Sequence, residues 1–295
     1  MNFTDKLNEY IKLTEDNLKG YNSNTPQTEY FKVLIDAMNY SLEAGGKRIR
    51  PVLVYEFCKA CGGKIEASYA PAAAIEMIHT FSLIHDDLPA MDNDDFRRGK
   101  PSCHKAFDEA TAILAGDALS VLPFEIISDD SLLSAEKKVK IISHLAKCVG
   151  REGMIGGQVI DMENEKKSDV TEENLRLMYK GKTCALIEAS CVMGCICAGA
   201  DDDHIKYAAE FANKLGLAFQ IIDDILDVIG TQEELGKPVG SDAEENKTTF
   251  VTLYGVDKAK EIAAEITAEA LEILEKFDNN EFLVELTNML LVRNN

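Results

Sequence analysis

The feature that most constrains the fold is a helical spacing of apolar residues that recurs along nearly the whole chain. Apolar side chains return three and four residues apart in six segments, at 30–44, 72–86, 135–150, 172–194, 202–230 and 257–277. This spacing predicts α-helices, and the sequence lacks the alternating pattern typical of strands. Several segments are apolar on most faces, which favours the middle of a helical bundle. We therefore predict one all-α domain over residues 1–295, a helical bundle.

Residues that begin and end helices stand beside these segments. Ser68, Thr171 and Asp201 are of the types that cap helix N-termini, and Gly150 and Gly199 are typical of C-termini. These positions support the helical boundaries that the apolar spacing predicts.

The charge balance limits the partners of the chain. A formal net charge of −20 argues against nucleic-acid binding, which needs a basic face. It would also repel an anionic substrate, so such a substrate needs local cations or metal ions. No uninterrupted apolar run approaches the ~18 residues of a membrane span, and the acidic N-terminal segment does not resemble a signal peptide. We therefore expect a cytoplasmic protein.

The chain has eight cysteines, and most are predicted to be small core residues. Six belong to this group: Cys103, Cys148, Cys184, Cys191, Cys195 and Cys197. Cys58 and Cys61 form a CxxC, but no second Cys/His pair stands at zinc spacing. Buried thiols are favoured there, and a redox or zinc role is the alternative.

The first unusual cluster is "LIHDDLPAMDNDDFRRG" at 83–99, which crowds acidic residues against two arginines. Asp86 and Asp87 end an apolar segment, and Pro89 interrupts the helix. Asp92 is six residues beyond Asp86, so an ideal helix would place it on another face. A kink or short loop must bring it back if these carboxylates act together.

A second acidic cluster stands 137 residues later, in "QIIDDILD". Gln220, Asp223 and Asp227 are spaced to share one stripe of a helix, with Asp224 beside them. Their neighbours are apolar, and buried carboxylates are costly unless they are paired or bind metal. Two such clusters facing one cavity predict several Mg²⁺ ions that hold a diphosphate. An N-terminal cap or a solvated acidic face is the alternative.

Basic residues lie at several further points. "EAGGKRIRP" combines paired glycines with Lys47, Arg48 and Arg50, which predicts an anion pocket or a basic helix end. Arg97 and Arg98 offer forked donors suited to phosphate oxygens. Weaker basic motifs are Lys180, Lys182 and Thr183 in one segment, and Lys237 and Lys247 after the second Asp cluster.

Taken together, these residues resemble the trans-isoprenyl diphosphate synthases, in particular the bacterial farnesyl diphosphate synthase type. The resemblance runs from about residue 30 to the C-terminus. It depends on ordered motifs: "GGKRIRP", "IEMIHTFSLIHDDLPAMDNDDFRRGKPSCH", "AILAGDAL", "GGQVIDM", "GKT", "AFQIIDDILD", "LGKPVGSD" and "NKTTF".

The resemblance implies roles for residues at matching positions. The implied metal ligands are Asp86, Asp87, Asp92, Asp223, Asp224 and Asp227. The implied isopentenyl diphosphate site contains Gly46, Lys47, Arg50, His79 and Arg98, although His79 on spacing alone is more typical of a core residue. The implied allylic diphosphate site contains Arg97, Lys182, Thr183, Gln220, Lys237 and Lys247. Catalytic roles fall to Asp86, Asp87, Asp92, Lys182, Asp223 and Asp224.

The implied reaction joins isopentenyl diphosphate head-to-tail to dimethylallyl or geranyl diphosphate. Metals withdraw the allylic diphosphate, the carbocation alkylates the isopentenyl double bond, and the departing diphosphate takes up the proton. The resemblance implies an all-α bundle around a deep central cavity and a homodimer. It also implies three Mg²⁺ per active site, with Mn²⁺ as a substitute.

Product length is expected to depend on two residues of segment 72–86. Phe81, five residues before Asp86, matches an aromatic position that limits the chain in farnesyl-type enzymes. Ideal helix geometry places Ser82 more nearly beneath Asp86. We expect (2E,6E)-farnesyl diphosphate, with geranylgeranyl diphosphate as the alternative.

Three other functions compete with an active synthase. A non-catalytic subunit of a heteromeric synthase usually lacks one Asp motif, whereas both are present. A terpene cyclase shares the fold and the metals but does not need Lys47 and Arg50. An acidic helical scaffold explains the helices and the charge but not the ordered cations.

Overall fold

Nearly all regular structure of the described chain is helical, and the only strands there form one short two-stranded ribbon. The computed structural model describes residues 2–23, 28–167, 169–230 and 247–291. The all-α class predicted from the sequence is confirmed. Two compact units divide the chain, residues 1–55 with 64–142 and residues 56–63 with 143–295. The single domain over 1–295 stays a prediction.

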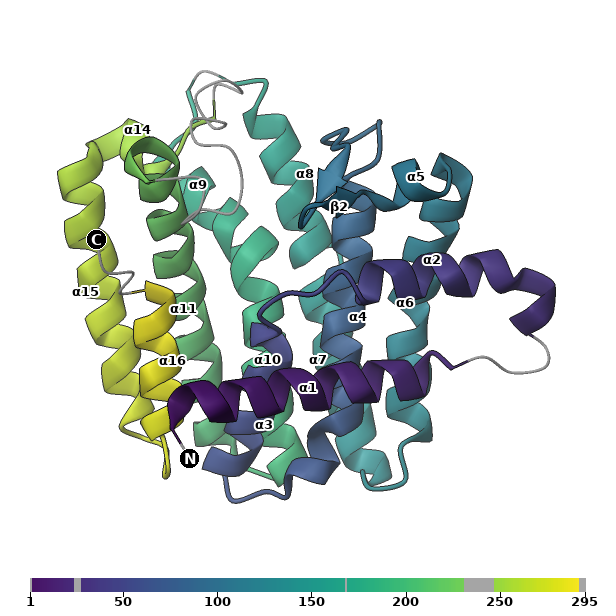
Figure 1. Ribbon diagram of the computed structural model, residues 1–295. Coiled ribbons are helices and arrows are strands. Elements are labelled where there is room, and N and C mark those ends of the chain that lie inside the picture. The colour runs from purple at the N-terminus through teal and green to yellow at the C-terminus, as the bar shows by residue number, and fades with distance from the viewer. Residues whose placement is uncertain (1, 24–27, 168, 231–246, 292–295) are drawn as a thin grey trace. The chain divides into compact units, whose positions relative to one another are not determined.

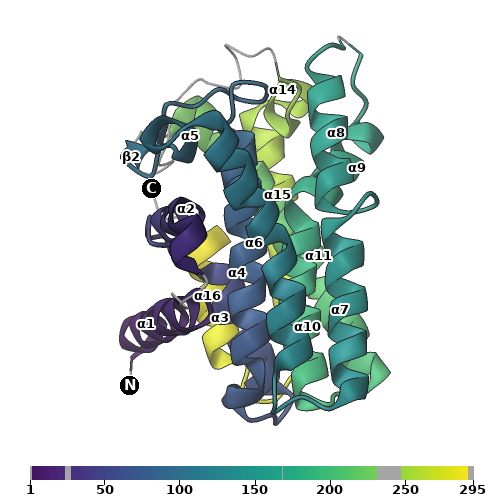
Figure 2. The ribbon, with the colours of Figure 1, turned by 90° about the vertical axis from the view of Figure 1, so that its right-hand side faces the viewer.

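The first unit is built on the pairing of two long helices. Its elements are α1 (Phe3–Tyr21), η1 (Thr28–Phe31), α2 (Lys32–Leu42), most of α3 (Ile49–Ala60), η2 (Ile65–Ser68), α4 (Tyr69–Asp86), β1 (Phe96–Arg97), β2 (Lys100–Pro101), α5 (Cys103–Ala106), α6 (Glu109–Asp129) and the start of α7 (Ala135–Val149). Helices α4 and α6 run side by side (Figure 2). Ile75, Ile78 and Leu119 from these two helices are fully buried. The rigid α4 therefore carries the Asp86 cluster at its C-terminal end.

The second unit is built around α11. Its elements are the ends of α3 and α7, α8 (Met154–Asn164), α9 (Glu172–Tyr179), η3 (Lys180–Cys184), α10 (Ala185–Ala198), α11 (Asp202–Ile229), α14 (Phe250–Tyr254), α15 (Val256–Leu274) and α16 (Glu281–Leu291). Helix α11 packs against α10 and α15 (Figure 1). The ring centroid of Phe57 lies 5.5 Å from that of Phe211 and 5.2 Å from that of Phe277. This aromatic core fixes α11, which carries the second Asp cluster.

Three of the predicted capping residues cap a helix in the structure, and Ser68 does not. Thr171 accepts a hydrogen bond from the backbone N–H of Asn174, and Asp201 accepts one from that of His204, so both cap as expected. Gly199 ends α10 with φ of 80°, a left-handed conformation that favours glycine. Ser68 precedes α4, but its hydroxyl donates to the carbonyl of Ile65 at 2.5 Å and does not cap the helix.

The six cysteines predicted to be core residues are all buried, which confirms that prediction. Within the CxxC, Cys58 is buried and Cys61 is half-buried. The sulfur of Cys61 lies 3.6 Å from that of Cys195 on α10. The sequence pattern gave no sign of this second pairing, because it depends on the packing of α3 against α10 within the unit.

Two helical stretches of the described chain are long and apolar enough to cross a membrane by length and composition alone. They are Glu109–Asp129 and Glu172–Ala198, and their most apolar windows are 39% and 72% buried. Neither stretch is an uninterrupted apolar run, because charged residues such as Asp117 and Lys180 fall within them. This is weak evidence for a span, because core helices pass the same test. The cytoplasmic location stays a prediction.

Candidate active site

In the first unit, the loop after α4 returns Asp92 to Asp86. Helix α4 ends at Asp86, with Asp87 as its C-terminal cap residue. The backbone N–H of Asp92 donates to the carbonyl oxygen of Asp86 at 2.9 Å, and that of Asn93 donates to Leu88 at 3.1 Å. Asn93 adopts φ of 54°, a left-handed conformation that Asn tolerates. The loop thus brings back the third Asp, as the DDxxxxD spacing requires if the three carboxylates act together.

Asp87 is almost fully buried and is compensated by Arg97. The Nε of Arg97 donates to Oδ1 of Asp87 at 2.9 Å, and its Nη2 also reaches Oδ2 of Asp94 at 3.2 Å. Burial raises the pKa of Asp87, although the hydrogen bond and charge of Arg97 oppose this shift. The ribbon of β1 and β2 holds Arg97 opposite Lys100. Arg97 therefore acts as a partner of a carboxylate here, and its contact with a diphosphate stays a prediction.

His79 lies in a strongly cationic environment. Burial, followed by the charges of Arg50, Arg98, Arg48 and Arg97, holds the pKa of His79 well below its ordinary value. Burial also lowers the pKa of Arg50, and the charge of Arg98 adds to this effect. A bound anion would relieve the repulsion among these groups. The cluster is therefore suited to a negatively charged ligand, as the sequence analysis predicted for Arg50, His79 and Arg98.

Gly46 allows Arg98 to approach the backbone of the GGKRIRP segment. The Nη1 of Arg98 donates to the carbonyl oxygen of Gly45. Gly46 has φ of 125°, and a Cβ at this position would lie 2.8 Å from Cζ of Arg98. Lys47 follows as an exposed side chain. Glycine is therefore needed at position 46 for both its conformation and its contact.

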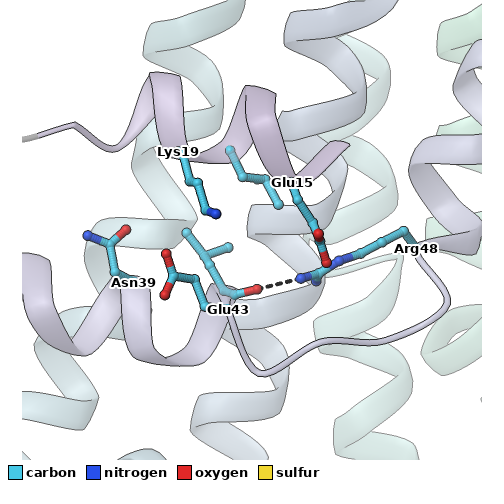
Figure 3. A pocket seen from close by; sticks show the side chains of 7 residues that line it. Glu15, Lys19, Asn39, Glu43 and Arg48 are labelled. Carbon is cyan, nitrogen blue, oxygen red and sulfur yellow. Dashed lines mark hydrogen bonds between the residues drawn. The ribbon is translucent and has the colours of Figure 1, made fainter. Parts of the chain in front are cut away.

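Arg48 has a structural role that the sequence analysis did not identify. Its Nη1 forms an ion pair with Oε1 of Glu76 at 2.7 Å, and the two side chains are 1% and 3% exposed. Its Nη2 donates to the carbonyl of Leu42 at 2.5 Å. Arg48 also lines a cavity of about 230 Å³, together with Glu15 and Lys19 of α1 and Asn39 of α2. Figure 3 shows these side chains around Arg48. Arg48 thus fixes the segment that carries its neighbours Lys47 and Arg50.

Phe81 and Ser82 lie on different stripes of α4. The ring of Phe81 is buried and meets that of His85 edge-on, with 5.7 Å between the centroids. His85 faces α6, where its Nε2 lies 3.1 Å from the carbonyl oxygen of Ile113. Ser82 is three residues after His79 and four before Asp86, so these three share a stripe. Phe81 therefore belongs to the α6-facing side of α4 and not to the Asp86 stripe.

In the second unit, α11 presents Gln220, Asp223 and Asp227 on one stripe. Their spacing of three and four residues aligns the three side chains on a helix. Asp227 is 1% exposed and Asp223 is half-buried. The helix is continuous from Asp202 to Ile229, so this stripe is the one that the sequence predicts.

Asp224 lies beside that stripe and accepts three hydrogen bonds. The donors are Tyr179 Oη at 2.7 Å, Gln220 Nε2 at 3.3 Å and the backbone N–H of Phe250 at 3.3 Å. These donors compensate the burial of a carboxylate that is 3% exposed. Gln220 also accepts from Thr183 Oγ1 at 3.0 Å, so two residues of the predicted allylic diphosphate site are in contact.

Lys182 stands on η3, a π-helical turn between α9 and α10. Its Nζ forms an ion pair with Oδ2 of Asp161 on α8. A Cβ on Gly157 would collide with the backbone nitrogen of Lys182, and one on Gly181 would lie 2.8 Å from Cα of Gly157. The two backbones therefore touch where both residues lack a side chain. π-Helical turns often occur at functional sites, and this one determines where Lys182 points.

These residues line a cavity of about 210 Å³ within the second unit. Its walls include Asp161, Tyr179, Lys182, Gln220, Asp224 and Lys247. The Nζ of Lys247 lies 3.7 Å from Oε1 of Glu165, which also lines the cavity. Lys237, which was predicted to bind the allylic diphosphate, lies outside the described residues. Acidic and basic side chains thus share one polar cavity, as binding of a metal-complexed anion requires.

The donor set of the two Asp clusters fits a hard divalent cation. Every predicted ligand is an aspartate, and Mg²⁺ prefers oxygen ligands. Asp227 and Asp224 are buried on a helix with apolar flanks, where carboxylates need cations or donors to offset desolvation. The residues present therefore fit Mg²⁺, which is the ion that the sequence analysis predicted.

A model of the polyprenyl synthetase family matches residues 31–289 of this sequence. The chain belongs to the polyprenyl synthetase family. Because this family is one of prenyltransferases, the chain is a prenyl-transferring enzyme, as the resemblance of its motifs implied. The match includes all of the predicted site residues from Gly46 to Lys247.

Individual members of the polyprenyl synthetase family are similar along most of the chain. A chloroplastic geranylgeranyl pyrophosphate synthase from Catharanthus roseus is 46% identical, over 88% of this chain and 74% of its own length. A geranylgeranyl diphosphate synthase from Cyanophora paradoxa is 45% identical, over 89% of this chain and 88% of its own. The crystal structure of an FPP/GFPP synthase from Zymomonas mobilis has a TM-score of 0.88, with 33% identity and coverage of 98% and 99%.

Three polar residues of the site were not predicted from the sequence: Glu76, Asp161 and Tyr179. Glu76 is the only acid in a long apolar stretch before Asp86, which is a sign of a buried partner. Asp161 stands one turn after Gly157 in the quoted motif "GGQVIDM". Tyr179 offers no comparable sign, because its bond to Asp224 depends on how α9 packs against α11.

Proposed function

We propose that the chain elongates prenyl diphosphates and forms geranylgeranyl diphosphate from isopentenyl diphosphate and an allylic diphosphate. The observation that carries this product is the similarity to named geranylgeranyl diphosphate synthases, at 45–46% identity over 88–89% of the chain. These comparisons favour the C20 alternative of the sequence analysis over its first choice, the C15 product. The position of Phe81 agrees, since it does not share the Asp86 stripe.

Farnesyl diphosphate is the second candidate product. The size of the buried Phe81 ring, as distinct from its position on α4, is the observation in its favour. A large buried ring on α4, one turn before His85, could still limit a chain that grows along the α6 side. The similarity to an FPP/GFPP synthase structure also supports this candidate, since FPP is one of the two products in that name. The two candidates differ only in where elongation stops.

Two sets of residues each bind one diphosphate group, one on isopentenyl diphosphate and the other on the allylic substrate. The cationic cluster of Lys47, Arg50, His79 and Arg98 binds the diphosphate of isopentenyl diphosphate, where fixed charges need no reorganisation. Lys182 and Thr183, held by Asp161 and Gln220, orient the allylic diphosphate. Arg97 and Lys247 contribute charge nearby, while Asp87 and Glu165 hold their positions. Positioning and electrostatics supply the rate enhancement, so no side-chain base is needed.

In each unit, the three aspartates of its cluster would hold Mg²⁺. When bound, Mg²⁺ supplies positive charge that favours departure of the allylic diphosphate. Asp224 and Asp227 are themselves buried from water. Electrostatic interactions at these carboxylates are therefore stronger than they would be in water. Loss of a cluster in either unit should therefore abolish turnover.

A homodimer is part of this proposal and is supported by an apolar surface on α6. Ile113, Leu114 and Val121 are 44%, 58% and 64% exposed on this helix. Leu114 and Val121 are two turns apart on one stripe, which suits the α6 of a second copy. Light scattering should give twice the mass of one chain, and Leu114→Glu with Val121→Glu should halve it.

The deciding experiment incubates purified protein with Mg²⁺, labelled isopentenyl diphosphate, and dimethylallyl, geranyl or farnesyl diphosphate in turn. Products are dephosphorylated and sized by chromatography, with Asp86→Ala as the control. A C20 alcohol that the control lacks supports the proposal. A C15 alcohol with no use of farnesyl diphosphate supports the second candidate. Absence of incorporation by folded protein overturns both and points to a non-catalytic subunit.

A further inference from the structure

Three metal-ligating side chains of different types converge within the second unit, away from the Asp clusters. His144 and Cys148 lie one turn apart on α7, and Glu188 lies on α10. Nε2 of His144 lies 3.5 Å from Sγ of Cys148 and 3.8 Å from Oε1 of Glu188. One ligand atom from each residue lies within 4.8 Å of the other two. The proposed prenyl-transfer chemistry uses none of the three.

The spacing of these atoms matches a tetrahedral metal centre. Zinc bonds of about 2.0–2.1 Å to nitrogen and about 2.3 Å to sulfur place the two ligand atoms about 3.6 Å apart. The same geometry places nitrogen and carboxylate oxygen about 3.4 Å apart. The observed 3.5 Å and 3.8 Å are close to these values. Small side-chain rotations would bring all three atoms to bonding distance from one central ion.

The surroundings resemble the supporting shell of a metal site. Nδ2 of Asn213 donates to the second carboxylate oxygen of Glu188 at 2.8 Å and to the carbonyl of Ala209 at 2.8 Å. This leaves Oε1 of Glu188 directed at His144. Cys148 is buried and the other two side chains are half-buried, so the position has restricted access to water. Outer partners of this kind orient the ligands and raise the affinity for metal.

We propose that His144, Cys148 and Glu188 form a Zn²⁺ site with three protein ligands and a fourth position for water. The nitrogen, sulfur and oxygen donors select a borderline ion of the zinc class over Mg²⁺, so this site is chemically distinct from the Asp clusters. On binding, Zn²⁺ replaces the proton of the Cys148 thiol, the S–H bond breaks, a Zn–S bond forms, and the proton passes to the buffer.

Without a bound metal, the surroundings of Cys148 favour the protonated thiol. Burial, with the charge of Glu188 adding, raises the pKa of Cys148 to about 12. Burial lowers the pKa of His144, although Glu188 opposes this shift, so a neutral ligating imidazole is favoured. A dication at the centre would offset both the buried thiolate and the carboxylate of Glu188.

The site would join the C-terminal part of α7 to the first turn of α10. Glu188 is six residues after Lys182, which is roughly 9 Å along a helix. Because η3 continues directly into α10, a bound Zn²⁺ would restrain the base of the turn that carries Lys182 and Thr183. The proposed site therefore restrains the segment that carries Lys182 and Thr183 from its C-terminal side.

Cobalt titration tests the proposal without any measurement of prenyl transfer. Reduced, chelator-stripped protein in Mg²⁺ buffer is titrated with Co²⁺, a spectroscopic probe for zinc sites. We expect a thiolate-to-cobalt charge-transfer band in the near ultraviolet and intense visible bands, all saturating at a single Co²⁺ per chain and bleached by Zn²⁺. Zn²⁺ should also raise the melting temperature, since it binds only the folded state.

Variants assign the signal to the three residues. Cys148→Ala should remove the charge-transfer band, and His144→Gln or Glu188→Gln should weaken binding at least tenfold. Asn213→Ala should weaken it about tenfold to a hundredfold, because it removes only the outer partner. Cys191→Ala, a buried thiol three residues beyond Glu188, and Cys61→Ala are the matched controls and should keep the band. Circular dichroism verifies that each variant is folded.

Two results would overturn the site. One is a reduced, folded wild-type protein that gives no charge-transfer band at saturating Co²⁺. The other is a band that survives Cys148→Ala or disappears in Cys61→Ala, which would place the metal on the Cys61 and Cys195 thiols. Because none of these readouts involves substrate, failure of the site and failure of the proposed prenyl transfer are distinguishable.

Discussion

The backbone N–H of Asp92 donates to the carbonyl oxygen of Asp86 at 2.9 Å, which closes the loop that begins at the end of α4. This bond is made by the main chain, so substitution of the Asp92 side chain leaves the loop intact. Asp92→Asn therefore removes one negative charge and keeps this backbone hydrogen bond. If Asp92 holds Mg²⁺, we expect kcat to fall on the order of a hundredfold to a thousandfold, comparable to loss of one well-placed electrostatic contact.

Asp95→Asn is the matched control for Asp92→Asn. Asp95 lies in the same acidic run, but its carboxylate is exposed and pairs with Lys105 at 2.8 Å. Turnover by this variant should stay within about twofold of wild type, since exposed pairs contribute little. Equal losses in the two variants would show that total negative charge, and not the position of Asp92, governs the rate.

Gly46 and Gly45 give a sharp test of the cationic cluster. Both have positive φ, of 125° and 85°, so an alanine at either costs about 1–3 kcal/mol of backbone strain. Only at position 46 would the new Cβ also meet the Arg98 guanidinium. Gly46→Ala should therefore raise KM for isopentenyl diphosphate by about tenfold to a hundredfold, because Arg98 is displaced.

Steady-state kinetics with isopentenyl diphosphate varied at saturating allylic substrate measure this effect. Gly45→Ala should lower the melting temperature to a similar extent but leave KM nearly unchanged, because no atom lies within 4 Å of its Cβ. If KM rises equally in both variants, backbone strain and not the Arg98 contact determines binding.

Features that follow from regular helix geometry could be predicted from the sequence, whereas features that depend on tertiary packing could not. The stripe of Gln220, Asp223 and Asp227 follows from helix geometry, which is local and regular, and the structure has it as predicted. For Asp92, the sequence predicts only that a kink or short loop must bring it back toward Asp86. The backbone hydrogen bond that closes this loop could not be predicted from residue spacing. Local rules therefore set the helices and their polar stripes.

Contacts between distant segments could not be predicted from the sequence. The pairs Arg48 with Glu76 and Lys182 with Asp161 join residues 28 and 21 positions apart. Arg48 lies in the segment between α2 and α3 and meets Glu76 on α4, whereas Lys182 on η3 meets Asp161 on α8. Both pairs depend on how these segments pack in three dimensions, which spacing in the sequence does not specify. The π-helical turn at Lys180–Cys184 is equally a product of packing, since its sequence would suit an ordinary α-helix.

The depressed pKa of His79 predicts a pH dependence of stability. Unfolded histidine titrates near pH 6.5, whereas burial and then the surrounding arginines keep folded His79 neutral well below that value. Below about pH 6.5 the unfolded chain therefore binds a proton that the folded chain does not, so the free energy of unfolding falls as pH falls. The slope from this group is at most about 1.4 kcal/mol per pH unit.

Denaturant unfolding at a series of pH values between about 7.5 and 5 measures that slope. His79→Gln cannot titrate, so its free energy of unfolding should fall less steeply with decreasing pH than that of wild type. His204→Gln is a useful contrast, because the Asp201 contact raises the pKa of His204 and its removal should steepen the fall. Identical slopes in wild type and His79→Gln would contradict the buried neutral state.

The backbone contact between α8 and η3 predicts that Gly157→Ala destabilises the protein. In an open helix interior this change gains up to about 1 kcal/mol of helix propensity. At position 157, however, the new Cβ collides with the backbone nitrogen of Lys182, which cannot rotate away. Overpacking should outweigh propensity and cost about 1–3 kcal/mol, or about 2–4 °C of melting temperature per kcal/mol. Activity should fall as well, because Lys182 is pushed from Asp161.

Gly20→Ala provides the opposite expectation on the same reasoning. Gly20 lies in α1, and a methyl group added there would have nothing within 4 Å, so the substitution should raise the melting temperature slightly and leave turnover unchanged. Thermal unfolding followed by circular dichroism, with prenyl transfer measured on the same samples, compares the two. A stabilised and fully active Gly157→Ala would mean that α8 and η3 are further apart than the structure places them.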